Sequence, residues 1–157
     1  MPQIRFYKIE SLQERPLQIC SIVADLYAKG HRVLIQTADL QEANELSHHL
    51  WSFRPETFIP HAIWPCRARL HPVILTPLPI PCLPGEVLLY ASPPSVLPSV
   101  LPASLIIDFA DPYDPKKRET DRERFSFWRK TGTSPEYITE STRERVNGNP
   151  VPPSPSR

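Results

Sequence analysis

The chain has 157 residues, a formal net charge of +1 and an apolar content typical of a globular protein. This length suits one domain with a hydrophobic core of its own. Because the net charge is close to zero, the composition excludes a generally basic coat for nucleic acid, and an anionic partner has to be bound by a local patch. No apolar run approaches the roughly 20 residues of a membrane-spanning helix, and Arg5 and Lys8 interrupt the first apolar stretch, which argues against a signal peptide. We therefore expect a cytoplasmic protein.

The cysteine, proline and glycine contents argue against several kinds of site and linker. The three cysteines, Cys20, Cys66 and Cys82, are odd in number and far apart, which favours reduced thiols over a disulfide framework or a metal site. The chain has 21 prolines and only 4 glycines. Glycine is therefore too scarce for a flexible linker or a phosphate-binding loop.

The first third of the chain predicts four elements from its apolar pattern: a strand over residues 3–9, a helix, a strand over residues 32–36 and a second helix. Pro16 suits the first turn of the first helix, and Gly30 suits the left-handed residue that follows its end. Asp39 and Glu42 match a capping box at the start of the second helix.

The remainder predicts three more strands and a last helix. The strands cover residues 73–76, 87–90 and 105–109, and the helix covers residues 115–131 and ends at Gly132. This alternation predicts an α/β fold with a Rossmann-like, mostly parallel sheet and helices on both faces. We expect a single domain over residues 1–142 and a disordered Pro/Ser-rich tail over residues 143–157.

The sequence signals of a nucleotide site are absent. The turn after the first strand has the sequence ESLQERP, which contains no glycine, and neither GxxxxGK[ST] nor GxGxxG occurs anywhere in the chain. We therefore expect no cofactor.

The histidines do not predict a metal or a catalytic centre. His48 and His49 are adjacent on a predicted helix and point about 100 degrees apart, so they cannot share a metal. Cys66 with His61 or His71 is the local candidate for nucleophilic catalysis, but no third group that would orient the histidine is evident nearby.

Two other segments have a composition that is typical of binding surfaces. The last helix, with the sequence KKRETDRERFSFWRK, carries seven basic and three acidic residues interleaved with Phe125, Phe127 and Trp128. Such a surface suits an acidic partner that also carries an apolar group. The alternative is a solvated charged face, in which Glu119 pairs with Arg122, and Lys117 and Arg118 pair with Asp121, along the helix.

The second segment covers residues 50–64 and is rich in large apolar side chains. It contains Trp51, Phe53, Phe58, Ile59 and Trp64 in a stretch interrupted by prolines. Either these side chains close the core, or some of them form an exposed aromatic patch that binds another protein.

With these segments in view, the chain resembles the chi subunit of bacterial DNA polymerase III holoenzyme. The resemblance spans about residues 3–132 and depends on FYKI, GHRVLIQTAD, LWSFRPETFIPH, IIDFADPYD and RERFSFWRKTG. It implies a Rossmann-like accessory subunit of the clamp-loader assembly without catalytic activity. It also implies two partners, the small psi subunit and the acidic, phenylalanine-ended tail of single-stranded-DNA-binding protein (SSB), with DNA contacted mostly indirectly.

The resemblance also implies which residues bind these partners. An arginine and an aromatic position of an RERY-type motif fall on Arg122 and Phe125, and a phenylalanine stands here where the family has tyrosine. With their neighbours on the helix, the candidates for the acidic peptide are Lys116, Arg118, Arg122, Phe125 and Arg129. The candidates for the psi-like partner are Trp51, Phe53 and Phe58.

Two other functions stay open at this stage. The mixture of arginine and aromatic side chains could bind single-stranded nucleic acid directly, through phosphate contacts and base stacking. A small α/β enzyme that uses Cys66 or a carboxylate in the proline-rich loops is the other alternative.

Overall fold

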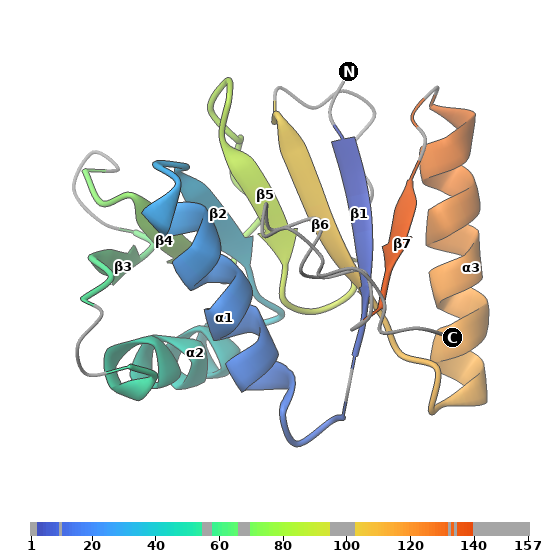
Figure 1. Cartoon of the computed structure of the whole chain (residues 1–157), viewed down its shortest axis with the longest axis horizontal. Coiled ribbons are helices and arrows are strands. Elements are labelled where there is room, and N and C mark those ends of the chain that lie inside the picture. Colours follow the sequence, from blue (N-terminus) through green and yellow to red (C-terminus); the bar gives the residue numbers. More distant parts are fainter. Residues whose placement is uncertain are drawn as a thin grey trace, which may run out of the picture.

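Seven parallel strands form one open sheet in the computed structural model (Figure 1). The structure describes residues 3–9, 11–54, 58–65, 70–94, 103–131, 133 and 135–139. In this part of the chain the strands follow the order β3-β4-β2-β5-β6-β1-β7 across the sheet. Their bounds are β1 Gln3–Lys8, β2 Val33–Gln36, β3 His61–Ile63, β4 Val73–Thr76, β5 Val87–Tyr90, β6 Leu105–Ala110 and β7 Glu136–Ile138.

Helices cover both faces of the sheet, as the sequence predicts. Helices α1 (Arg15–Ala28) and α2 (Leu40–Ser52) pack on one face, and helix α3 (Pro115–Lys130) packs on the other (Figure 1). The strands alternate accordingly: Val33 of β2 belongs to the core under α1 and α2, and Leu34 belongs to the core that contains Trp128 of α3. Strands β4, β5 and β6 are buried along their whole length, as expected for the centre of a parallel sheet.

The predicted helix ends have a structural basis. The side chain of Asp39 accepts a hydrogen bond from the Glu42 amide at 2.8 Å, and Glu42 accepts one from the Ala38 amide at 2.9 Å, which forms a capping box whose return bond reaches the residue before the N-cap. After α1, Gly30 has a φ of +84°, and its amide donates to the Tyr27 carbonyl at 3.0 Å. The His31 amide donates to the Leu26 carbonyl, which completes a Schellman motif.

The differences from the sequence expectations lie at the edges. The three-residue strands β3 and β7 were not predicted, because so short a segment carries no readable alternation. Helix α3 ends at Lys130, one residue before the predicted end, with Thr131 as its C-cap. The proposed tail over residues 143–157 lies outside the described residues. Within the described part, no helix has the length and apolar character needed to cross a bilayer.

Candidate interaction surfaces

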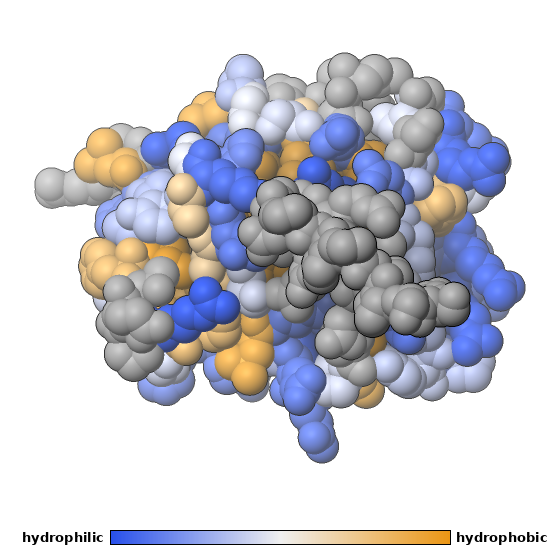
Figure 2. Space-filling view, viewed as in Figure 1, coloured by the Kyte–Doolittle hydropathy of each residue, from blue (hydrophilic) through white to orange (hydrophobic). Residues whose placement is uncertain are grey.

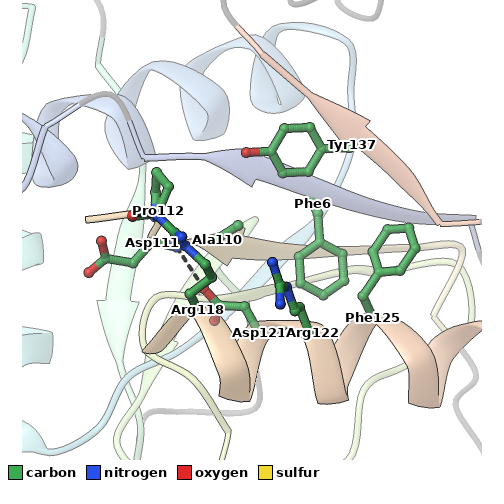
Figure 3. Close-up of a pocket in the computed structure, with 9 residues that line it drawn as sticks. All are labelled: Phe6, Ala110, Asp111, Pro112, Arg118, Asp121, Arg122, Phe125 and Tyr137. Carbon is green, nitrogen blue, oxygen red and sulfur yellow. Dashed lines mark hydrogen bonds between the residues drawn. The ribbon is translucent and has the colours of Figure 1, made fainter. Parts of the chain in front are cut away.

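A pocket opens between α3 and the β1–β7 edge of the sheet. Its volume is about 410 Å³, and Figure 3 shows side chains from four parts of the fold around it. The lining residues are Phe6 of β1, Ala110, Asp111 and Pro112 at the end of β6 and after it, Arg118, Asp121, Arg122 and Phe125 of α3, and Tyr137 of β7.

Aromatic rings form one end of the pocket. The rings of Phe6 and Phe125 lie 5.4 Å apart between centroids and are tilted by 59°. Phe6 is buried, Phe125 is half-buried, and Tyr137 is 48% exposed on the opposite wall (Figure 3). This end therefore offers an apolar space that is open to solvent and wide enough for another ring.

Two guanidinium groups accompany the aromatic rings. Arg118 and Arg122 are one helical turn apart on α3, so both reach the same side of the helix. Arg118 donates a hydrogen bond to the Pro112 carbonyl at 2.7 Å, which holds it beside the pocket. Arg122 is exposed and lies between Arg118 and the rings (Figure 3). A cationic site thus adjoins an apolar one.

The structure brings together three of the five residues expected to bind an acidic peptide. Arg118, Arg122 and Phe125 line the pocket. Lys116 and Arg129 are exposed on α3, outside its lining. Phe6 and Tyr137 could not be assigned to this site from the sequence, because their place in it depends on which strands pack beneath α3.

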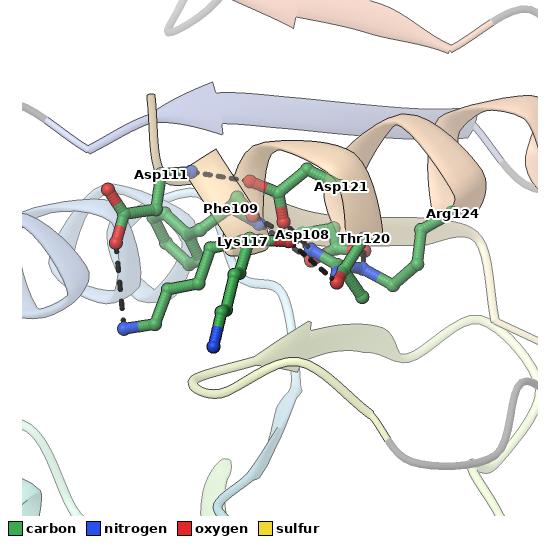
Figure 4. A network of polar contacts seen from close by, with 8 residues as sticks. Asp108, Phe109, Asp111, Lys117, Thr120, Asp121 and Arg124 are labelled. Atoms are coloured by element: carbon green, nitrogen blue, oxygen red, sulfur yellow. Dashed lines mark hydrogen bonds and ion pairs between the residues drawn. The ribbon is translucent and has the colours of Figure 1, made fainter. Parts of the chain in front are cut away.

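A buried network of charges attaches α3 to β6 (Figure 4). Arg124 donates to Asp108 at 2.9 Å and to Asp121 at 2.7 Å, and it also donates to the Phe109 carbonyl. Arg124 and Asp108 are almost fully buried. Burial works against the charge of Arg124, but its hydrogen bonds to Asp108 and the attraction of the carboxylates outweigh burial, and the pKa of Arg124 is raised. The second arginine of the RERF sequence is therefore a structural residue.

The same network corrects the ion pairs expected along the helix. Asp121 bonds Arg124 and accepts a hydrogen bond from the Asp111 amide at 2.7 Å. Lys117 reaches Asp111 at 3.6 Å instead of Asp121. The carboxylates at the end of β6 attract these groups because the loop after β6 brings them next to the first turns of α3.

A second surface lies at the opposite edge of the sheet, on α2 and the segment that leads into β3. The rings of Trp51 and Phe58 lie 5.4 Å apart, and these side chains are 56% and 64% exposed. We call these two residues the aromatic pair. Two other apolar residues of this segment contribute to the core instead. Ile59 is buried, and Phe53 is half-buried and packs against the core under α1 and α2.

The two surfaces are separated by the width of the sheet. Strand β3 is the first strand in the sheet order and β7 is the last. In Figure 2, hydrophilic residues gather along the α3 edge, and hydrophobic residues appear on the β3 edge. A protein bound at one edge therefore leaves the other edge accessible.

Of the two described histidines considered for catalysis, the ring of His61 is bonded to protein groups, whereas Nδ1 of the His71 ring is buried without a hydrogen-bond partner. His61 is buried, and its two ring nitrogens lie 2.9 Å from the Ser47 hydroxyl and 2.9 Å from the Ile59 carbonyl. The His71 carbonyl accepts a hydrogen bond from Arg32. Cys66 lies outside the described residues. His48 is exposed and His49 is half-buried on α2, and the described residues contain no group of three or more His, Cys, Asp or Glu side chains that could hold a metal.

Comparison with known proteins decides the family. The sequence model of the family described as "DNA polymerase III chi subunit, HolC" matches residues 1–136. The chain belongs to the DNA polymerase III chi subunit family. A relative in this family, the DNA polymerase III subunit chi of Pseudomonas aeruginosa strain PAO1, is 31% identical over 137 residues, which cover 84% of this chain and 92% of that protein. The chi family is one of accessory subunits, and the fold agrees with the family resemblance found in the sequence.

A solved structure shares the fold alone. The chain superposes with a TM-score of 0.63 on one chain of a solved Saccharomyces cerevisiae complex, described as dbp5 l327v bound to nup159, gle1 h337r, ip6 and adp. The identity is 11%, and the match covers 94% of this chain but only 44% of that one. At this identity the likeness supports the parallel α/β architecture and nothing about ligands.

Proposed function

We propose that this chi-family chain is a non-catalytic subunit of the clamp-loader assembly that joins a psi-like subunit to the acidic C-terminal tail of SSB. In this proposal it works in the bacterial cytoplasm and needs no cofactor. Membership of the chi family supports the assignment to the polymerase, and the two separate surfaces support the bridging role.

The observation that carries the proposal is the pocket in which Arg118 and Arg122 adjoin Phe6, Phe125 and Tyr137. A peptide that ends in phenylalanine presents a ring and a free carboxylate close together. The aromatic end of the pocket can take the ring, and a guanidinium group can bind the carboxylate through two parallel hydrogen bonds.

The charges beyond the pocket suit the rest of such a tail. Lys116 and Arg129 are exposed on α3, one near each end of the helix. They add positive potential around the pocket and attract acidic residues before binding. Because exposed charges are screened by salt, binding should weaken as ionic strength rises.

The aromatic pair supports the second half of the bridge. Two large rings that are more than half exposed are unusual on a free surface, and aromatic residues are enriched where proteins bind each other. Because the pair lies at the β3 edge and the pocket lies at the β7 edge, the two partners can bind at the same time.

The experiment is a calorimetric titration of the chain with a peptide that carries three aspartates and a C-terminal phenylalanine. We expect saturable binding that weakens between 50 and about 300 mM salt, and much weaker binding of the same peptide with an amidated C-terminus. A single-stranded oligonucleotide is titrated in parallel. Tight binding of the oligonucleotide together with no loss on amidation would contradict the proposal and favour the direct nucleic-acid binder.

A further inference from the structure

The exposed rings of the aromatic pair rest on a buried histidine. The ring of His61 lies 4.7 Å from the ring of Trp51, tilted by 50°, and Trp51 in turn contacts Phe58. His61 is only 7% exposed, whereas both members of the pair are more than half exposed. The buried imidazole therefore packs against the Trp51 ring on the side that faces the protein interior.

His61 is itself fixed from two sides. Its Nδ1 lies 2.9 Å from the Ile59 carbonyl, which can only accept, so the proton of the neutral ring is on Nδ1. The other nitrogen, Nε2, then accepts from the Ser47 hydroxyl at 2.9 Å. These bonds leave the imidazole no freedom to rotate and tie edge strand β3 to helix α2.

Ser47, His61 and Trp51 form one connected group of side chains. Ser47 and Trp51 are four residues apart on α2, so they lie on one side of the helix. Ser47 orients His61, and His61 limits the rotation of Trp51. We propose that His61 is a positioning residue that keeps the aromatic pair in one exposed arrangement before the partner binds.

The benefit of such positioning is entropic. An interface loses affinity when mobile side chains have to be immobilised on binding, and a prearranged pair avoids part of that loss. A histidine suits the task because its flat ring packs against the indole while both nitrogens are bonded at its edge. Phenylalanine could supply only the packing, and asparagine only a hydrogen bond. This inference rests on the proposed role of the aromatic pair in binding the psi-like subunit.

The first test needs no partner. The indole N–H signal of Trp51 is identified in a ¹⁵N-labelled protein by its loss in Trp51→Leu, and its heteronuclear NOE reports the mobility of the ring. We expect a rigid indole in the parent protein, clearly greater mobility in His61→Asn, and a smaller change in Ser47→Ala. His31→Asn, at an exposed histidine after α1, is the matched control and should leave the signal unchanged.

The second test measures affinity for the purified psi-like subunit. His61→Asn and His61→Phe should each weaken binding about 3- to 10-fold, the scale of one aromatic contact, without a comparable loss of affinity for the acidic peptide. In the Trp51→Leu background the same substitutions should have no further effect, since His61 acts through Trp51.

The outcomes separate the two ideas. An indole equally mobile in the parent and in His61→Asn would overturn the positioning role, whatever the partner does. If His61→Asn and His61→Phe bind the psi-like subunit like the parent while Trp51→Leu does not, the positioning role is again wrong but the proposed surface stands. If Trp51→Leu also binds like the parent, the proposed surface fails.

Discussion

At the scale of single residues, neighbouring arginines of one short sequence have opposite roles. Arg122 is exposed beside the pocket, whereas Arg124 is buried and bonded to Asp108 and Asp121. The helix explains this difference, because residues two apart on an α-helix point to nearly opposite sides. The composition of the RERF sequence therefore does not show which arginine is available for a ligand.

Replacing Arg122 with alanine should weaken binding of the phenylalanine-ended acidic peptide by about 1.5–3 kcal/mol, the range for hydrogen bonds to a charged group. Arg129→Ala is the control on the same helix, and it should cost less and mainly at low salt, because Arg129 lies outside the pocket lining. Calorimetry with both variants at two salt concentrations measures the difference. Equal effects of the two substitutions would mean that the helix acts only through its overall charge.

At the scale of elements, the position of α3 depends on a few buried polar contacts in addition to the packing of Trp128. Arg124 joins the helix to the end of β6, and Asp121 accepts from the Asp111 amide in the connecting loop. The pocket lies between this helix and strands β1 and β7, so its shape depends on the same contacts. A change in the network should affect both folding and binding.

The substitution Arg124→Met should lower the free energy of unfolding by about 3–5 kcal/mol, because it leaves buried carboxylates without their cation. Burial pushes the pKa of Asp108 up, and Arg124 opposes that push in the parent protein. The folded pKa of Asp108 is already raised in the parent, and in the variant it should rise further, so the protonated form favours the folded state more strongly. The loss of unfolding free energy in Arg124→Met relative to the parent should then be largest at neutral pH and should shrink as the pH falls.

Urea unfolding at several pH values, followed by circular dichroism, measures this effect. Arg129→Met removes an equal charge from an exposed position of α3 and should change stability by less than about 0.5 kcal/mol. A deficit in Arg124→Met that stays constant from neutral to acidic pH would contradict the electrostatic explanation and point to lost packing alone.

At the scale of the whole molecule, the sheet holds two surfaces apart. The aromatic pair lies on the β3 side and the pocket lies on the β7 side, with five strands between these edges in the sheet order. A rigid parallel sheet with both faces covered gives a fixed separation. This arrangement fits a subunit that links two proteins without bringing their binding sites together.

The two surfaces should therefore act independently. Trp51→Ala should prevent capture of the psi-like subunit and leave acidic-peptide affinity unchanged, while Arg122→Ala should do the reverse. In the double variant the two losses should add to within about 0.5 kcal/mol, as for sites without shared contacts. A thermal melt of each variant serves as the control for folding. A Trp51→Ala protein that loses both partners and melts at much lower temperature would show that Trp51 is structural.

Much of this protein follows from local sequence. The four buried strands β2, β4, β5 and β6, the capping box at Asp39 and the turn at Gly30 were all predictable, because apolar runs, caps and left-handed glycines depend on neighbours in the chain. The resemblance to the chi family rests on local motifs as well, and the family comparison confirms it.

Only the tertiary structure decides which of the candidate binding residues share a surface. Phe6 and Tyr137 join Phe125 only because β1 and β7 are neighbours at the sheet edge beneath α3, although 131 positions separate them in the sequence numbering (137 − 6). Likewise, Arg124 is buried and Arg122 exposed because of the side of α3 that faces β6. Contacts between distant segments depend on strand order and helix orientation, and neither is encoded in the composition or periodicity of one segment.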